Sequence, residues 1–162
     1  MSAPIYAEGF APVFDEKSRV LILGSFPSVK SREIGFYYGN KQNRFWKTVC
    51  GFFGEEVPPS IEEKKAFLLR RNIALWDVIT SCEVVGSSDA SIRNETVAEI
   101  PALLKKSQIQ KILCNGTKSF SLLADKFPQL LEMTVKLPST SPANSRFSKE
   151  MWVGELSRIF GE

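Results

Sequence analysis

The fold is indicated by the stretch Arg19-Val20-Leu21-Ile22-Leu23-Gly24, a short apolar run that ends in glycine. A strand that is buried on both faces, as in a parallel sheet, has this continuous apolar pattern. Three later runs resemble it, at residues 72–79, 110–116 and 131–137. Apolar residues at helical spacing predict helices from near Asn43 to Gly51 or Gly54, and at 61–71, 96–105, 117–127 and 147–160.

Strands that alternate with helices predict an α/β protein whose parallel sheet is covered on both faces. We therefore expect a three-layer α/β/α architecture with a central four-stranded, mainly parallel sheet. The 162 residues, of which 43% are hydrophobic, suffice for one substantial core, so a single domain over residues 1–162 is predicted. Functional residues of such folds gather at the carboxyl ends of the strands.

Composition limits where the protein works and what it binds. A net charge of +3, from 21 Lys and Arg against 18 Asp and Glu, permits an anionic partner without requiring one. The cysteines, Cys50, Cys82 and Cys114, form no CxxC pair and lie in apolar surroundings, which predicts reduced core residues of a cytoplasmic protein and no metal site. No apolar run approaches ~20 residues and no secretion signal precedes the domain, so we expect no membrane contact.

The chain contains no histidine. Ser-His-Asp and Cys-His hydrolysis, His-ligated zinc and His acid–base catalysis are therefore excluded. Catalysis would have to use carboxylates, amides, hydroxyls, Lys and water held by the backbone. These groups suit a reaction whose transition state is stabilised electrostatically.

Two loops at the expected carboxyl edge of the sheet are unusual. Residues 138–146 contain two prolines, several small hydroxyl residues, an Asn and an Arg, which makes a stiff, thin loop suited to nucleic acid. Residues 35–44 combine aromatic side chains with Gly and Asn. Such a loop can stack a planar heterocycle and read its edge, although its tyrosines could equally plug the loop against the sheet.

Three motifs carry a resemblance to a known family. They are Gly24-Ser25-Phe26-Pro27-Ser28, Gly35-Phe36-Tyr37-Tyr38-Gly39-Asn40-Lys41-Gln42-Asn43-Arg44-Phe45-Trp46 and Leu137-Pro138-Ser139-Thr140-Ser141-Pro142-Ala143-Asn144-Ser145-Arg146. Together they resemble the uracil-DNA glycosylase superfamily, and within it the hypoxanthine-DNA (deoxyinosine) glycosylases, with mismatch-specific uracil-DNA glycosylases as related enzymes. The resemblance implies a DNA repair enzyme that hydrolyses the N-glycosidic bond of a flipped hypoxanthine, or of uracil or xanthine. The substrate would be double-stranded DNA, the product an abasic site, and the enzyme a monomer that uses water and no metal or cofactor.

The resemblance also implies a catalytic amide. Many relatives carry an Asn or Asp in the first motif that positions water, and Phe26 stands there in this chain. The branch with this departure takes its amide from further along the loop, which implies Asn40 or Asn43. An oxocarbenium-like sugar would form before water attacks. Alternatively, Asn43 caps the following helix and Asn40 serves a left-handed turn next to Gly39.

Four residues are implied to bind the base. Tyr38 matches the aromatic residue that stacks on the flipped base in relatives, and Phe26 would add a second apolar wall. Asp77 ends the second predicted strand, where its carboxylate would accept a hydrogen bond from N1–H of hypoxanthine or N3–H of uracil. Asp77 could instead cap a helix or pair with an Arg, and Asn115, which follows the third strand, could be only a turn residue.

The last motif resembles the segment that enters the minor groove and fills the gap left by the flipped nucleotide. Ser139, Thr140 and Ser141 would hold phosphates, and the wedge would be formed by Pro142, Ala143, Asn144 and Arg146. Ser28 of the first motif is a further expected DNA contact. Arg44, Lys118 and Lys149 could also contact phosphates, or remain solvated surface charges.

Two other functions are compatible with the same residues. A non-catalytic nucleic-acid-binding module would retain damaged DNA without cutting it, with Phe26 marking a lost active site. Hydrolysis of a free nucleoside would leave the wedge loop without a purpose.

Overall fold

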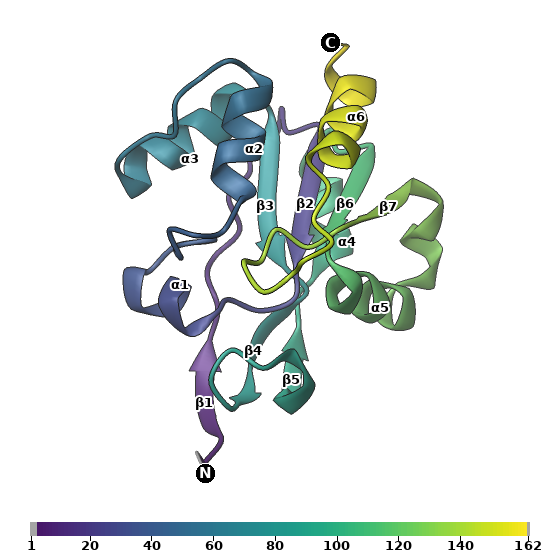
Figure 1. Cartoon of the computed structure of the whole chain (residues 1–162). Coiled ribbons are helices and arrows are strands. Elements are labelled where there is room, and N and C mark those ends of the chain that lie inside the picture. Colours follow the sequence, from purple (N-terminus) through teal and green to yellow (C-terminus); the bar gives the residue numbers. More distant parts are fainter. Residues whose placement is uncertain (1–2, 162) are drawn as a thin grey trace.

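The structure is a computed structural model that describes residues 3–161 (Figure 1). Its centre is a four-stranded sheet with the order β3-β2-β6-β7, in which all neighbours are parallel. The strands are β2 (Val20–Gly24), β3 (Ile73–Asp77), β6 (Lys111–Asn115) and β7 (Thr134–Leu137). The predicted parallel sheet is confirmed.

Helices cover both faces of this sheet, as Figure 1 shows. Alternate residues of β2 point to opposite faces, so Ile22 packs in one core and Leu23 in the other. The first core lies beneath α2 (Phe45–Phe52), α3 (Ile61–Arg70) and α6 (Lys149–Phe160). The second lies beneath α4 (Ile100–Lys105) and α5 (Thr117–Lys126). The three-layer α/β/α architecture is confirmed.

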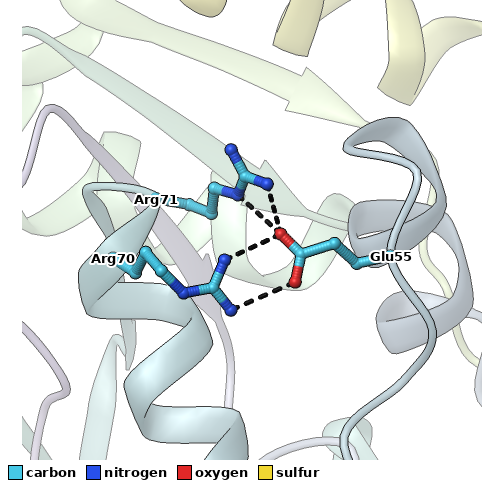
Figure 2. A network of polar contacts seen from close by, with 3 residues as sticks. All are labelled: Glu55, Arg70 and Arg71. Atoms are coloured by element: carbon cyan, nitrogen blue, oxygen red, sulfur yellow. Dashed lines mark hydrogen bonds and ion pairs between the residues drawn. The ribbon is translucent and has the colours of Figure 1, made fainter.

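An ion-pair network holds the connection between α2 and α3 against the end of α3 (Figure 2). The Glu55 carboxylate accepts hydrogen bonds from Arg70 at 2.8 and 3.1 Å and from Arg71 Nε at 2.8 Å, with Arg71 Nη2 as a further donor. Both arginines hold the pKa of Glu55 at about 2, below its ordinary range. The network lies beside α2 and α3, and none of its three residues lines the site described below.

A second, three-stranded antiparallel sheet with the order β1-β4-β5 was not predicted. Its strands are β1 (Ile5–Glu8), β4 (Ile79–Val84) and β5 (Arg93–Val97). The predicted strand at 72–79 therefore ends at Asp77, and the next strand begins two residues later. The predicted helix at 96–105 is wrong over its first residues, because Thr96 and Val97 belong to β5 and the helix begins at Ile100.

Three short helical segments complete the chain. They are α1 (Val29–Ile34) and the 3-10 helices η1 (Asp89–Ser91) and η2 (Pro128–Met133). The predicted strand at 131–137 is thus a strand only from Thr134, since its first half forms η2. Within residues 3–161, no helix combines the length and apolar character that a membrane span requires.

Candidate active site

A cavity of about 380 Å³ opens at the carboxyl ends of the parallel strands. It is bounded by the loop after β2, the loop that leads into α2, the end of β3, the turn after β6 and the loop between β7 and α6. In Figure 1 the last of these loops crosses in front of the strand ends. All residues predicted for the site line the cavity except Asn144 and Arg146: Phe26, Ser28, Tyr38, Asn40, Asn43, Asp77, Asn115, Ser139, Thr140, Ser141, Pro142 and Ala143.

Asp77 is the buried acid of the cavity. It ends β3, only 5% of the residue is exposed, and its Oδ2 has no hydrogen-bond partner in the described structure. Burial raises the pKa of Asp77 to about 7, and the charge of Asp89 adds to the rise, while a hydrogen bond from the Gly24 backbone opposes it. An unpartnered buried carboxylate oxygen is costly, so the cavity is built to offer this acceptor to something that enters it.

Gly24 makes room for this carboxylate. It pairs with Asp77 in the register of β2 and β3. A Cβ atom at Gly24 would lie 2.4 Å from Asp77 Oδ1 and 3.1 Å from the Tyr38 hydroxyl oxygen. Any residue larger than glycine here would therefore press on both the carboxylate and the hydroxyl.

Tyr38 brings the second unpartnered polar group. Its hydroxyl oxygen is buried and has no hydrogen-bond partner in the described structure. Burial and the nearby Asp77 carboxylate raise the pKa of Tyr38, so the hydroxyl keeps its proton and remains a donor. One face of the ring is stacked on Phe45, with a centroid distance of 4.3 Å, which leaves only the other face for a base.

The backbone of Tyr38 is strained, with a φ of 54° that a bulky residue rarely adopts. The left-handed turn that the sequence suggested for Asn40 is thus at Tyr38 instead. Ser31 of α1 supports this loop, because its Oγ accepts a hydrogen bond of 2.9 Å from the Gly39 amide. The strain is concentrated at the residue whose hydroxyl faces Asp77.

The two candidate catalytic amides have the same local geometry. Asn40 Oδ1 accepts a hydrogen bond of 2.9 Å from the Gln42 amide, and Asn43 Oδ1 accepts one of 2.9 Å from the Phe45 amide. The Asn43 contact reaches the amide of the first residue of α2, but the N-cap position of this helix is Arg44, which makes no side-chain capping bond, so Asn43 is not the N-cap. In both side chains the oxygen is engaged with the backbone, and the NH₂ group is left to act as a donor.

Asn115 connects β6 to the loop at 138–146. Its Nδ2 donates to Thr140 Oγ1 and its Oδ1 accepts from the Thr140 amide, both at 3.0 Å. Thr140 is completely buried. Both of its polar groups that were expected to hold phosphate are therefore occupied by Asn115, and Thr140 does not face a DNA backbone in this conformation.

The same loop is also held from within. Asn144 Nδ2 donates to the Ser139 carbonyl at 2.9 Å, and its Oδ1 accepts from the Arg146 amide at 3.0 Å. Asn144 shapes the loop, while Pro142, Ala143 and Arg146 are exposed. The exposed part of the loop is thus a short, preorganised finger beside the cavity.

Arg44 clamps this loop to the start of α2. Its backbone amide donates to the Thr140 carbonyl at 3.1 Å, and its Nη2 donates to the carbonyls of Ser141 and, at 2.9 Å, Asn144. The guanidinium also lies 4.5 Å from the centre of the Phe147 ring. Although the sequence suggested a phosphate contact for Arg44, its guanidinium is turned to the carbonyls of the loop.

Replacement of Arg44 by Lys is expected to lower the free energy of unfolding by about 1–3 kcal/mol, because one ammonium cannot reproduce a guanidinium that bridges two carbonyls and stacks on a ring. Urea unfolding measures the change. Arg158→Lys, at an exposed position on α6, is the matched control and should be as stable as the wild type. Equal stability of Arg44→Lys and the wild type would show that the clamp is unnecessary.

Several polar residues of the cavity were not among the predicted base-binding or catalytic residues. They include Ser25, Ser87, Asp89 and Lys118. Ser87 and Asp89 belong to the connection between β4 and β5, which the sequence did not reveal as part of a sheet. The polar run Gly86-Ser87-Ser88-Asp89 has the composition of any surface turn, so nothing in it signals a site.

Comparison with known proteins identifies the family to which this chain belongs. The family model of the uracil DNA glycosylase superfamily matches residues 11–156. The chain belongs to the uracil DNA glycosylase superfamily. The prediction of a DNA glycosylase fold is thereby confirmed, and the cavity occupies the position of the expected motifs.

Individual relatives of this superfamily member cover nearly its whole length. A protein of Methanosarcina acetivorans named hypoxanthine DNA glycosylase is 39% identical over 147 residues, which are 87% of this chain and 90% of that protein. A protein of the same name from Methanosarcina barkeri is 34% identical over 88% of this chain and 90% of its own length. A solution NMR structure of a candidate uracil DNA glycosylase from M. acetivorans superposes with a TM-score of 0.81 at 34% identity, covering 96% of this chain and 99% of that one.

Proposed function

We propose that this glycosylase removes hypoxanthine from duplex DNA by hydrolysing its N-glycosidic bond, which leaves an abasic site. The observation that carries the proposal is the pair of buried, unpartnered polar groups beside Gly24, namely the Asp77 carboxylate and the Tyr38 hydroxyl. Hypoxanthine offers N1–H as a donor and O6 as an acceptor on adjacent atoms. Asp77 would accept from N1–H while Tyr38 donates to O6.

The same pair discriminates against the normal purine. Adenine has an acceptor at N1, which would face the acceptor oxygen of the ionised Asp77, so the hydrogen bond that reads N1–H is lost. A site built for a hydrogen bond rejects an analogue that cannot form it far more strongly than an apolar pocket does. Uracil, with N3–H and O4, shares the pattern of hypoxanthine and is the further substrate that the pair admits; xanthine has N1–H and O6 as well.

The walls of the cavity would hold the base between them. The free face of Tyr38 is available for stacking, which is worth roughly 1–3 kcal/mol for each base. Phe26 would add an apolar wall, with the Arg32 guanidinium already 5.6 Å from the centre of its ring. Asn115, which already ties down Thr140, would complete the pocket with the second hydrogen of its NH₂ group. The energy of stacking offsets part of the cost of flipping the nucleotide out of the duplex.

Asn40 and Asn43 would serve the chemical step as donors. Departure of the base leaves positive charge on the sugar, and water then attacks C1′. An amide NH₂ can hold the oxygen of that water, and both candidate side chains line the cavity with their NH₂ groups left as donors. Because the Asn43 side chain also satisfies the first amide of α2, Asn40 is the more available of the two.

The exposed finger would fill the space left in the duplex. Pro142, Ala143 and Arg146 are its exposed members, and Ser28, Ser139 and Ser141 line the cavity where phosphates would pass. Thr140 and Asn144 would position the finger and not contact DNA. All of these groups come from one chain, which supports a monomer acting on duplex DNA, and the three buried free cysteines support a reducing, cytoplasmic setting.

The experiment that tests the proposal is single-turnover glycosylase activity on duplexes that contain one deoxyinosine or one deoxyuridine. Asn40→Ala is expected to slow hypoxanthine release about 100-fold with little loss of stability, because its hydrogen bond to the Gln42 amide is exposed. Asn43→Ala should lower both the rate and the free energy of unfolding, the latter by about 1 kcal/mol, because its partly buried hydrogen bond to the first amide of α2 is lost. Gln129→Ala, at an exposed position in η2 that does not line the cavity, provides the matched control for the rate.

The outcomes distinguish the alternatives. Wild-type protein that binds the damaged duplex tightly but releases no base would instead be a binding module. Equal release from a duplex and from free deoxyinosine nucleoside would favour a nucleoside hydrolase. An Asn40→Ala variant as fast as the wild type would remove Asn40 from the chemistry.

A further inference from the structure

The cavity holds a second carboxylate that the motifs do not account for. Among the described residues, Asp77 and Asp89 are the two acidic side chains that line it. Asp77 is buried at the end of β3, whereas Asp89 lies in η1 and is exposed to solvent. The two are close enough for the charge of Asp89 to raise the pKa of Asp77. One acid is therefore at the base of the cavity and the other at its mouth.

The connection between β4 and β5 is docked firmly on the first motif. Ser25 Oγ donates to Asp89 Oδ1 at 2.9 Å, and Ser87 Oγ accepts from the Val29 amide at 2.9 Å. Arg32 joins the two segments, because it donates to the Gly86 carbonyl at 2.6 Å and to the Pro27 carbonyl at 3.2 Å. Asp89 is thus a fixed part of the cavity wall. Its carboxylate is held by Ser25, a residue of the first motif, in which Phe26 replaces the Asn or Asp of many relatives.

A flipped nucleotide would bring its sugar to the level of Asp89. A nucleotide enters such a cavity with its base first, so the base reaches the buried Asp77 and the sugar stays near the mouth. Positive charge develops at C1′ and O4′ as the bond to the base breaks. A carboxylate at that level stabilises the charge, as preorganised groups do where charge develops.

The chemical step also needs an acceptor for a proton of the attacking water. The Asn40 and Asn43 oxygens already accept backbone hydrogen bonds, and Phe26 offers no polar atom. Partial desolvation raises the pKa of Asp89, while the Ser25 hydrogen bond and the charge of Lys118 act in the opposite direction. Asp89 Oδ2 carries no hydrogen bond to any residue that the structure describes, so it is free to accept one.

We propose that Asp89, supplied by the β4–β5 connection, is a catalytic residue that stabilises the cationic sugar and accepts the proton of the attacking water. This inference rests on the proposed function. The N-glycosidic bond breaks with its electron pair leaving on the base, which takes up a proton from solvent. The water oxygen bonds to C1′ and its proton passes to Asp89, which returns it to solvent. Ser25 is the positioning residue for this carboxylate.

The test compares Asp89→Asn with the wild type in single turnover at saturating protein. Asn keeps the size of the side chain and an oxygen for the Ser25 hydroxyl, but it removes the charge and the basic oxygen. We expect the rate of base release to fall about 100-fold. The dissociation constant for a duplex with a non-hydrolysable 2′-fluoro-deoxyinosine should stay within about twofold of the wild type or become smaller, since a negative charge near DNA is lost.

Three comparisons separate a catalytic role of Asp89 from a structural one. Glu83→Gln removes one negative charge from an exposed position on β4 outside the cavity and should react like the wild type. The loss caused by Asp89→Asn should be equal for hypoxanthine and uracil, because the sugar is common to both. Ser25→Ala, which releases the carboxylate, should cause a smaller loss in rate with an unchanged dissociation constant.

A failure of the role proposed for Asp89 can be told apart from a failure of the proposed function. An active wild type with an Asp89→Asn variant of the same rate overturns this inference and leaves the proposed function intact. The inference is also overturned if the rate falls only in proportion to weaker binding of the fluorinated duplex. A wild type that releases neither base overturns both the proposed function and the role of Asp89.

Discussion

Asp77→Asn is expected to slow the release of hypoxanthine at least 100-fold while the protein stays folded. The substitution places an NH₂ donor or a weaker acceptor where N1–H of the base has to find its partner, and a mismatched buried hydrogen bond carries a penalty of this order. Single-turnover release from a deoxyinosine duplex is the measurement. Asp125→Asn, at an exposed position on α5, is the control and should match the wild type. Full activity of Asp77→Asn would remove Asp77 from base recognition.

The pH dependence of the same pair of proteins gives an independent reading of this carboxylate. Burial raises the pKa of Asp77 to about 7, with Asp89 contributing. The ionised form is the stronger acceptor for N1–H, since the protonated form carries a donor of its own, so hypoxanthine release by the wild type should increase as pH rises through about 7. A rate that is unchanged between pH 6 and pH 8 would contradict this assignment.

The free energy of unfolding should change with pH in the direction opposite to the rate of hypoxanthine release. The pKa of Asp77 is above its ordinary 3.8 in the folded state, so the folded protein holds the proton more tightly than the unfolded chain. Between about pH 4 and pH 7 the free energy of unfolding therefore falls as pH rises, and Asp77→Asn should flatten most of this fall. Glu55, whose pKa is lowered from 4.5 to about 2, makes the opposite contribution, which changes mainly between about pH 2 and pH 4.5 and overlaps only the acid end of this window. Urea unfolding at several pH values measures both proteins.

Among substitutions of single small residues, Gly24→Ala should cause the largest loss of stability and activity. The added Cβ would meet Asp77 Oδ1 at 2.4 Å and the Tyr38 hydroxyl at 3.1 Å, and both belong to rigid parts of the site. We expect a loss of about 1–3 kcal/mol in the free energy of unfolding and at least a 100-fold loss in rate, since the two base-reading groups have to separate.

The control for this change is Gly51→Ala in α2, where an added Cβ meets nothing within 4 Å. Because alanine favours a helix over glycine, this variant should be as stable as the wild type or up to about 1 kcal/mol more stable. Equal stability and activity of Gly24→Ala and the wild type would show that the carboxylate and the hydroxyl do not need their close approach.

The sequence allowed the central sheet to be predicted because each strand of a parallel sheet is buried on both faces. Val20–Gly24 is the clearest case, since all its residues are buried. The antiparallel sheet escaped notice for the converse reason. β5 (Arg93–Val97) has no fully buried residue and carries charged side chains, and β4 follows β3 without a Gly or Pro to mark the boundary.

The candidate site could be predicted at positions that belong to sequence motifs or end apolar strands. It could not be predicted where a role depends on the partners of a side chain in the folded protein. Asp77 and Asn115 were found because they end apolar strands. The roles of Thr140 and Arg44 were not, because burial and the partners of a side chain are properties of the packed loop. Asp89 was missed because it reaches the cavity from a hairpin whose docking through Ser25, Ser87 and Arg32 has no local signature.

We propose that this glycosylase recognises a purine by N1–H and O6 and then cuts its bond to the sugar. The most direct test is mass-spectrometric detection of free base after wild-type protein is incubated with three matched duplexes, which carry deoxyinosine, 1-methyl-deoxyinosine or deoxyadenosine at the same position. We predict release of hypoxanthine from the first duplex and no base from the other two. Release of 1-methylhypoxanthine or adenine at a comparable rate, or no release from deoxyinosine, would contradict this mode of recognition.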